Sequence, residues 1–166
     1  MTGEATIRAA GPEDVHDIHR LLSALAAEIG DAEIFRTTEA TLRRDGFGGR
    51  AHFEVLLAEI GGLPEALALF MPYYSTTMAM PGVYVQDLYV SPDARGRALG
   101  TRLLAAAMAR GQDWGAGFLR LTVYRDNEPA IGFYRRLGFG FGHEDLAAGI
   151  EAEALLAAAR SVEEQG

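Results

Sequence analysis

The sequence predicts an α/β fold in which a mixed, mostly antiparallel sheet of about six or seven strands is flanked by helices. Strand-like and helix-like segments alternate along the chain, and Gly61-Gly62 joins two apolar, strand-like runs. The 166 residues are enough for one ordinary domain and too few for two, and no linker or low-complexity segment divides them. We therefore predict a single domain over residues 1–166.

The N-terminal part predicts one strand and two helices. A short strand is expected at residues 5–9, and Pro12 followed by two acidic residues predicts a helix start, because carboxylates suit the positive end of the helix dipole. A second helix is expected to begin at Thr38, whose hydroxyl can cap free amides, and to stop at Gly46 in the left-handed conformation. The apolar residues of the first helix recur at three- and four-residue steps and share one face: Val15, Ile18, Leu21, Leu22 and Leu25.

The middle of the chain predicts consecutive strands. Residues 53–60 and 66–74 lie on either side of the glycine pair and are expected to form an antiparallel hairpin. A polar, proline-bearing connection at 75–82 leads to a third strand at 83–90.

The last part of the chain alternates helices and strands. A loop beginning at Ser91 leads into a helix whose buried face is expected to carry Leu99, Leu103, Ala107 and Met108. Further strands are predicted at 119–124, 139–142 and 147–150, and further helices at 129–137 and 151–160.

Composition and charge argue against several classes of function. The formal net charge of −8 disfavours a nucleic-acid binder, because phosphates would be repelled. It would attract a cationic small substrate; the alternative is a charge that only favours solubility and steers no ligand. Without cysteine there is no disulfide and no thiol nucleophile. No apolar run approaches the roughly 20 residues of a membrane span. The first residues lack a basic region followed by an apolar stretch, so no secretory signal is expected unless processing has removed one, and we expect a cytoplasmic protein without membrane contact. His16 and His19 have helical spacing but no third candidate ligand, so no metal site is predicted.

A loop rich in arginine and glycine enters the helix near residue 99. Gly96 and Gly100 allow close backbone approach, and Arg95 and Arg97 carry charge for phosphate oxygens. Unpaired amides at a helix start also attract anions. The segment therefore predicts a phosphate cradle, although it matches neither the nucleotide P-loop nor the dinucleotide fingerprint; the alternative is a surface helix start with incidental arginines.

Two motifs resemble signatures of the GCN5-related N-acetyltransferase (GNAT) superfamily. Residues 95–100, Arg-Gly-Arg-Ala-Leu-Gly, resemble its acetyl-CoA signature Arg/Gln-x-x-Gly-x-Gly/Ala, except that Ala98 stands where the family usually has glycine. Residues 127–139 resemble its second signature, Asn-x-x-Ala-x-x-x-Tyr-x-x-x-Gly-Phe. The motifs have the order and spacing of the family, and the predicted strands and helices follow its fold.

Other segments resemble the spermidine/spermine and thialysine N-acetyltransferase branch of that family. They are residues 45–48, 53–59, 74–76 and 82–90, and the likeness covers most of residues 5–139. It implies an N-acetyltransferase that acts on a primary amine of a small cationic substrate, a polyamine or a lysine-like amino acid. It also implies a homodimer.

The resemblance implies a site for acetyl-CoA. The amides of residues 95–100 would hold the pyrophosphate, and the strand at 88–90 would splay from its neighbour and offer backbone groups to the pantetheine arm and the thioester. Asn127 would hydrogen-bond the cofactor, and Phe133 would help to shape its groove. The implied cofactor residues are Leu88, Tyr89, Val90, Arg95, Gly96, Arg97, Ala98, Leu99, Gly100, Thr101, Asn127 and Phe133.

The resemblance also implies catalytic and substrate residues. Tyr134 matches the tyrosine that protonates the leaving thiolate, although an aromatic ring there could instead only pack the helix. The branch has a glutamate where this chain has Gln86, and an amide cannot act as a base. Asp87 is expected to hold a cationic amine or polarise a water, but strand neighbours point to opposite faces. Acidic residues that could attract the substrate are Glu28, Asp31 and Glu33.

Two alternatives remain open at this level. The acceptor could be a peptide or antibiotic amine, since the residues after Gly138 lose the likeness to the branch. The chain could also be a non-catalytic acyl-CoA-binding module, because Gln86 and Ala98 both depart from the expected residues and fold alone does not fix activity.

Overall fold

The computed structural model describes residues 3–142. The chain divides into two compact units, Met1–Gly132 and Phe133–Gly166. The sheet and the first three α-helices belong to the first unit. The described part of the second unit is residues 133–142, which begin within helix α4 (Glu128–Arg136).

The strands of the first unit form one sheet in the order β1-β2-β3-β4-β5, so each strand lies beside its neighbour in sequence. The pairs β1–β2, β2–β3 and β3–β4 are antiparallel, and β4–β5 is parallel. The mixed, mostly antiparallel α/β architecture is therefore confirmed. The strands are β1 (Ala5–Ala9), β2 (Glu54–Ile60), β3 (Leu63–Ser75), β4 (Met80–Val90) and β5 (Leu119–Leu121).

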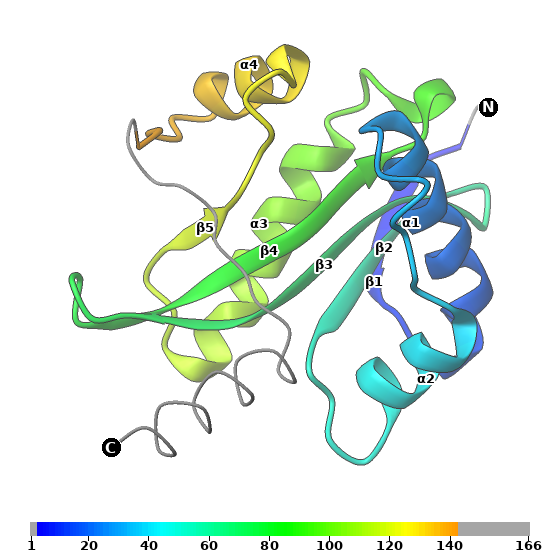
Figure 1. Ribbon diagram of the computed structural model, residues 1–166, viewed down its shortest axis with the longest axis horizontal. Coiled ribbons are helices and arrows are strands. Elements are labelled where there is room, and N and C mark those ends of the chain that lie inside the picture. The colour runs from blue at the N-terminus through cyan, green and yellow to red at the C-terminus, as the bar shows by residue number, and fades with distance from the viewer. Residues whose placement is uncertain (1–2, 143–166) are drawn as a thin grey trace, which may run out of the picture. The chain divides into compact units, whose positions relative to one another are not determined.

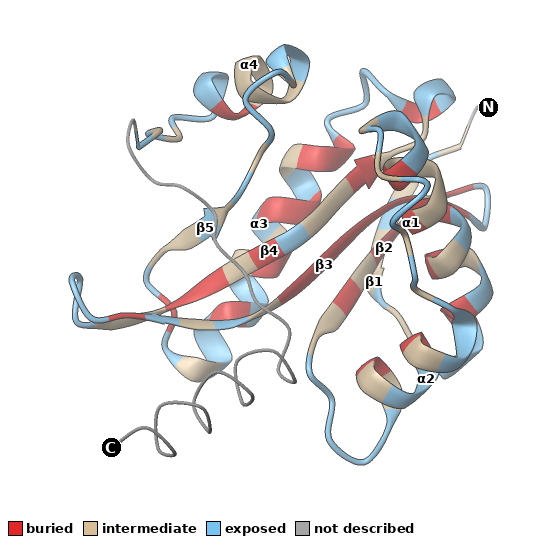
Figure 2. Cartoon of the chain, viewed as in Figure 1, coloured by how far each residue is buried: buried red, intermediate tan, exposed pale blue. Residues whose placement is uncertain are grey.

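Helices cover both faces of this sheet (Figure 1). Helices α1 (Val15–Glu28) and α2 (Glu39–Phe47) lie on one face, and α3 (Leu99–Gly111) lies on the other. Buried residues follow the strands and the helix sides that face them (Figure 2). The sheet thus separates two apolar layers, which is the usual way to bury one face of each helix.

The layer under α1 and α2 follows the predicted periodicity. Ile18 and Leu21 are fully buried against strand residues such as Leu57 and Leu67. In the opposite layer, alanines on the strands let α3 approach closely, and Leu103 is fully buried there. The predicted face of α3 is right except at Met108, which is only partly buried. Leu104 is buried as well.

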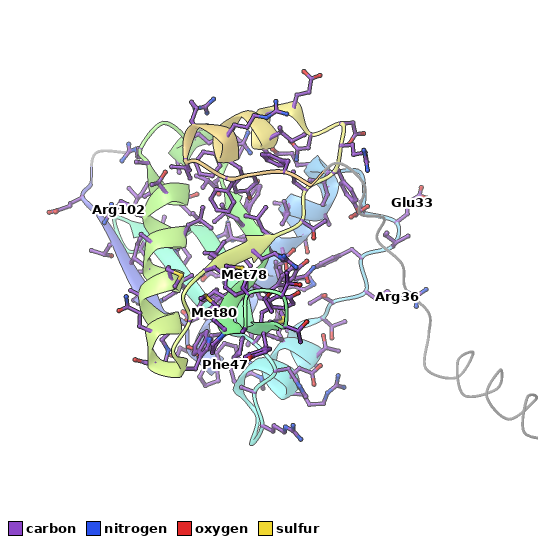
Figure 3. All side chains as sticks on the ribbon, turned by 90° about the vertical axis from the view of Figure 1, so that its left-hand side faces the viewer. Glu33, Arg36, Phe47, Met78, Met80 and Arg102 are labelled. Carbon is purple, nitrogen blue, oxygen red and sulfur yellow. The ribbon has the colours of Figure 1, made fainter. Side chains whose placement is uncertain are left out.

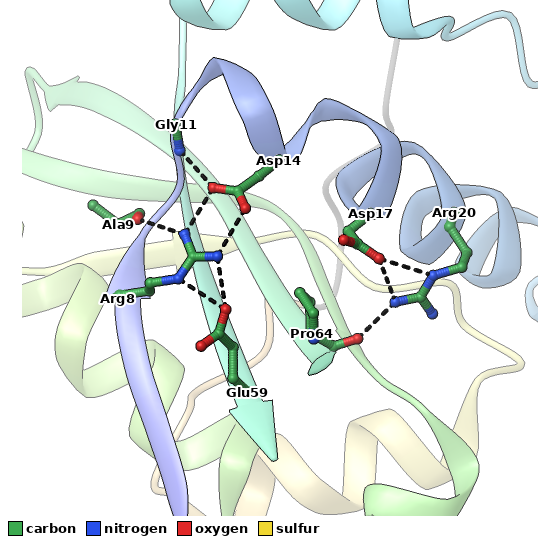
Figure 4. Close-up of polar contacts among 8 residues, drawn as sticks. All are labelled: Arg8, Ala9, Gly11, Asp14, Asp17, Arg20, Glu59 and Pro64. Carbon is green, nitrogen blue, oxygen red and sulfur yellow. Dashed lines mark hydrogen bonds and ion pairs between the residues drawn. The ribbon is translucent and has the colours of Figure 1, made fainter. Parts of the chain in front are cut away.

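Polar side chains fasten β1 to its neighbours at one edge of the sheet (Figure 4). Arg8 donates to both carboxylate oxygens of Asp14 at 2.7 Å and to Glu59 on β2 at 2.8 Å. Asp14 is buried and also accepts from the amide of Gly11 at 2.7 Å. The Arg8 guanidinium holds the pKa of Asp14 below its usual range. This network connects the first strand, the first helix start and β2.

Turn and cap residues behave largely as the sequence predicts. Gly61 and Gly62 have φ values of 60° and 82°, which suits the two left-handed positions of a tight hairpin turn. Thr38 caps α2, because its hydroxyl accepts from the amide of Thr41 at 3.1 Å. Both predictions are confirmed.

The predicted stop of the second helix at Gly46 is wrong. Gly46 lies inside α2 and is buried, and the helix ends at Phe47. The following Gly48 has an extended backbone, with φ of −77°, so no left-handed cap ends this helix. A β-carbon on Gly46 would lie 2.5 Å from the ring of Phe53. The glycine is there for close packing.

Several predicted strand limits also change. The β3–β4 hairpin is longer than expected, because only residues 76–79 form its turn, near Met78 and Met80 in Figure 3. Strand β5 ends at Leu121 instead of residue 124, since its pairing stops opposite Val85. Residues 139–142 form no strand; Gly138 turns the chain with φ of 90°, and Phe141 instead lies against the Arg135 guanidinium.

Residues 3–142 therefore contain five strands in place of the six expected up to residue 142. The strand predicted at 147–150 and the helix at 151–160 lie outside the described residues. Within the described part of the chain, no helix is long and apolar enough to cross a membrane.

Candidate active site

The turn between β4 and α3 has the backbone of an anion site. Gly96 and Ala98 both have left-handed conformations, with φ of 79° and 56°. The first amide of α3 bonded along the helix is that of Arg102, which donates to the carbonyl of Ala98 at 3.0 Å. The amides of residues 99–101 have no acceptor inside the helix, so their N–H groups are available to a ligand at its positive end.

The positive φ of Ala98 explains why this sequence position favours glycine. An L-residue is strained in the left-handed region, whereas glycine is not. Ala98 nevertheless adopts this left-handed conformation, and its side chain is exposed. The chain therefore forms a left-handed turn at this position without a glycine.

The two arginines of the turn are engaged by other parts of the first unit. Arg95 makes a bidentate ion pair with Glu28 at the end of α1, at 2.6 and 2.7 Å. Its Nε also donates to the carbonyl of Val90 at 3.1 Å. Arg97 approaches the carbonyl of Gly3 at 3.4 Å. Arg95 thus connects the turn to both β4 and α1.

The second half of β4 has one free edge among the described residues. Strand β5 pairs with β4 only at residues 83–85. Beyond that point Leu88, Tyr89 and Val90 pair with β3 alone. Their side chains are anchored in the two apolar layers, Tyr89 under α1 and the other two under α3. The free backbone groups therefore sit on a rigid strand that leads directly into the turn.

A β-bulge lies where β4 parts from β5. Val85 pairs with Phe70 and Asp87 with Leu69, so Gln86 is an extra residue without a partner on β3. A bulge breaks the alternation of side chains along a strand. As a result Gln86 and Asp87 line the same cavity. The expectation that these neighbours face opposite sides is wrong.

This cavity has a volume of about 460 Å³ and lies on the α1/α2 face of the sheet. Its walls come from helices α1 and α2, the segment that connects them, the residue just before β2, and strands β3 and β4. The cavity is lined by Leu22, Leu25, Ala26, Ile29, Asp31, Ile34, Phe35, Arg36, Thr37, Thr41, Leu42, Asp45, Phe53, Leu69, Met71, Gln86 and Asp87.

The charged residues among the apolar lining are Asp31, Asp45, Asp87 and Arg36. Asp31 accepts a hydrogen bond of 2.8 Å from the Tyr124 hydroxyl, and Asp45 pairs with the neighbouring Arg44. Burial raises the pKa of Asp87 to about 6. A mainly apolar cavity with an acidic lining suits a small cationic ligand with a hydrocarbon body.

The acidic residues of the first helices have three different positions. Asp31 lines the cavity, whereas Glu28 forms an ion pair with Arg95. Glu33 is exposed and extends outward from the segment between α1 and α2, as does Arg36 (Figure 3). Sequence reasoning missed that this segment forms a cavity wall. The signal was the apolar pair Ile34-Phe35 in an otherwise polar stretch.

Asn127 begins helix α4. Its side-chain oxygen accepts from the amide of Ala130 at 3.2 Å, and its carbonyl accepts from the amide of Ile131 at 3.0 Å. These contacts fix the helix start through the two oxygens of Asn127, and they leave its side-chain NH₂ group as a hydrogen-bond donor for a ligand.

Tyr134 and Phe133 belong to the second unit. The Tyr134 ring lies between Phe133 and Phe139, with centroid distances of 5.2 and 5.3 Å. Tyr134 is buried, and this burial raises the pKa of its phenol to about 12. The phenol therefore stays protonated at every pH at which a protein usually works, as a proton donor must.

The histidines of α1 are held by other groups. His16 Nδ1 lies 2.8 Å from a carboxylate oxygen of Glu39, and His19 Nε2 lies 3.0 Å from the carbonyl of Thr37. In residues 3–142, no group of three or more potential ligands is arranged to hold a metal ion.

Sequence comparison identifies the family. The profile of the Acetyltransferase (GNAT) family matches residues 17–139. The chain is 33% identical over 140 residues to thialysine N-epsilon-acetyltransferase of Mus musculus, covering 80% of this chain and 82% of that protein. It is 28% identical over 138 residues to spermidine/spermine N(1)-acetyltransferase-like protein 1 of Homo sapiens, covering 80% of this chain and 20% of that protein.

Comparison of structures gives the same fold. An aminoglycoside N-acetyltransferase in complex with CoA superposes with a TM-score of 0.69 at 17% identity, covering 92% of this chain and 98% of the other. At that identity the likeness concerns the fold alone. Taken with the family match and the relative at 33% identity, it completes the assignment. The chain belongs to the GNAT family and is an acetyltransferase.

Proposed function

We propose that the protein transfers an acetyl group from acetyl-CoA to a primary amine of a small cationic substrate. The observation that carries the proposal is the layout of β4. Its end leads into a turn with free amides, and its bulge opens onto an acidic, mainly apolar cavity. One strand thereby connects a site suited to a phosphate group with a site suited to an amine.

The residues of the turn fit the pyrophosphate of acetyl-CoA. The amides of residues 99–101 lack helical acceptors, and Gly96 and Ala98 already hold the left-handed conformations that turn backbone N–H groups to one side. Arg95 and Arg97 bring positive charge to the same turn. The free edge at Leu88, Tyr89 and Val90 would bind the pantetheine arm, and Asn127 and Phe133 are further candidate contacts.

When bound, acetyl-CoA supplies an activated acyl group as a thioester. The residues of this chain would place the acceptor and handle the protons. Backbone N–H groups of the free β4 edge would stabilise negative charge on the thioester oxygen, an effect worth about 3–4 kcal/mol in comparable sites. Gln86 and Asp87 would contact the amine from the floor of the cavity.

Tyr134 is the proposed acid for the departing thiolate. Its phenol is kept protonated, since burial raises its pKa to about 12. We expect Tyr134→Phe to lower kcat by about 10²- to 10⁴-fold, because only the hydroxyl is removed. The affinity for acetyl-CoA, measured by calorimetry, should not change. Full turnover in this variant would exclude the acid role.

The lining of the cavity supports the proposed substrate class. A polyamine or lysine-like amino acid has a cationic end and a flexible hydrocarbon body, which match Asp87 and the walls at Leu22, Leu25 and Met71. The thialysine N-epsilon-acetyltransferase relative supports the lysine-like choice, since it covers most of both chains. Peptide and antibiotic amines are the alternative acceptors.

The test is release of free thiol from acetyl-CoA across a panel of amines. The panel contains thialysine, lysine, spermidine, an aminoglycoside and an N-terminal peptide, each with the acetylated product identified by mass spectrometry. We expect turnover with thialysine or lysine. Acetyl-CoA binding without turnover on any amine would instead favour the acyl-CoA-binding module that Gln86 makes conceivable. A homodimer in the cytoplasm stays a prediction, and light scattering after size-exclusion chromatography measures the oligomer.

A further inference from the structure

We propose that Asp87 is the proton acceptor for the substrate amine, the task that the amide side chain of Gln86 is unable to perform. This inference rests on the proposed function, because it assigns a role within the same reaction. It follows from the position of the carboxylate, its lack of protein partners and the groups that surround it.

The bulge determines the position of Asp87. Because Gln86 is the extra residue of β4, the side chains of Val85 and Asp87 fall on opposite faces of the sheet. Val85 is buried in the sheet, and Asp87 lines the cavity opposite Leu69. The carboxylate therefore lies on the strand that leads to the turn at residues 95–101. From this strand, the carboxylate could accept a proton from an amine in the cavity directly or through one water molecule.

Asp87 differs from the other carboxylates of the cavity in its partners. Asp31 is bonded to Tyr124, and Asp45 is paired with Arg44. Among residues 3–142, no hydrogen bond or ion pair to the Asp87 carboxylate is present. Its oxygens are thus available to a substrate or to a water molecule between them and the amine.

The surroundings make this carboxylate a better base than an exposed one. The neighbouring walls contributed by α1 and β3 are apolar, and the other charged residues of the lining are Asp31 and Arg36 from the α1–α2 segment and Asp45 from α2. The Arg36 side chain extends outward (Figure 3). None of these three determines its protonation: burial alone raises the pKa of Asp87 to about 6. Asp87 is therefore mostly ionised near pH 7 and still able to take a proton.

The ammonium form of the substrate gives one proton to Asp87, directly or through a water molecule, and Asp87 returns it to solvent. The freed lone pair forms the N–C bond to the acetyl carbon as the C–S bond breaks. The nitrogen loses a second proton, and the thiolate gains one. The net products are the acetamide, free CoA and one proton.

The experiment compares Asp87→Asn with the wild type on two amines of the same skeleton. One is the best substrate of the panel, and the other carries two fluorine atoms on the carbon next to the amino-bearing carbon, so that it is largely neutral near pH 8. We expect Asp87→Asn to reduce kcat about 10²- to 10⁴-fold with the parent amine. With the fluorinated amine the loss should shrink to below about tenfold, because that amine needs no base.

Asp45→Asn is the matched control, since it removes an equal charge from the same cavity. We expect kcat/KM of this variant to rise with pH through the same midpoint, near 6, as in the wild type, because kcat/KM reports the groups of the free enzyme. Asp87→Asn should lose that rise. Equal losses of Asp87→Asn on both amines, or an unchanged pH profile, would overturn the assignment and leave Asp87 as a substrate-binding residue.

A carboxyl ¹³C NMR titration of the free protein measures the pKa of Asp87 and requires no turnover. The expected midpoint is about 6 and the signal is absent from Asp87→Asn. A midpoint in the range of an exposed aspartate would contradict the proposal. If the wild type acetylates no amine, the proposed function itself fails. If the wild type and Asp87→Asn acetylate the parent amine equally well, only the role of Asp87 fails.

Discussion

Replacing Ala98 by glycine should stabilise the protein, although it removes a side chain. Ala98 has φ of 56° and ψ of 19° at the start of α3. The left-handed conformation costs an L-residue about 1–2 kcal/mol, whereas glycine loses about 0.5–1 kcal/mol more chain entropy on folding. The methyl group is exposed, so its removal leaves no cavity. We expect Ala98→Gly to raise the free energy of unfolding by about 0.5–1 kcal/mol.

The assay is urea unfolding at 25 °C combined with a thermal melt, in which the gain corresponds to about 1–4 °C in Tm. Ala79→Gly is the matched control, because Ala79 is also exposed and has φ of 53° in the β3–β4 turn. Both variants should gain stability, and neither should change acetyl-CoA affinity. A loss of stability in Ala98→Gly beside a gain in Ala79→Gly would refute the reasoning, since the methyl of Ala98 would then make a contact of its own.

Two further changes test the contacts of the first unit. Asp14→Asn should lower the free energy of unfolding at pH 7 by about 2–3 kcal/mol, because it weakens charge-assisted bonds to Arg8. The pKa of Asp14 is lower in the folded protein than in the unfolded chain, where it is about 3.9. The stabilisation is therefore present above the unfolded pKa and disappears as the pH falls through the folded pKa. The free energy of unfolding of the variant, measured in urea, should depend less on pH in that acidic range. Glu28→Gln should free Arg95 for phosphate and tighten acetyl-CoA binding about two- to fivefold, as measured by calorimetry. The control Glu39→Gln makes an equal charge change on α2 and should leave the affinity unchanged. Weaker binding in Glu28→Gln would show instead that the ion pair positions the turn.

The sequence predicts most of the fold because its elements are marked by local signals. The periodicity of Ile18 and Leu21, the cap at Thr38 and the paired glycines each act within a few residues. Gly46 misleads for the opposite reason. Its role depends on the Phe53 ring, which reaches it only in the folded chain.

The candidate site is less accessible to sequence reasoning. The turn at residues 95–101 has recognisable residues, but the strain at Ala98 appears only in the backbone angles. No residue in the sequence marks the bulge at Gln86, since strand-forming residues precede and follow it without a glycine or proline at the bulge. For that reason the shared cavity of Gln86 and Asp87, and the wall supplied by residues 29–37, required the structure.

The central proposal for this protein is that the turn between β4 and α3 binds acetyl-CoA. A titration of the ¹⁵N-labelled protein with acetyl-CoA, followed by amide NMR, tests this without relying on turnover. We predict that the amide signals of Leu99, Gly100 and Thr101 move most, because their N–H groups lack helical acceptors. Saturable binding that leaves these three signals in place would contradict the account.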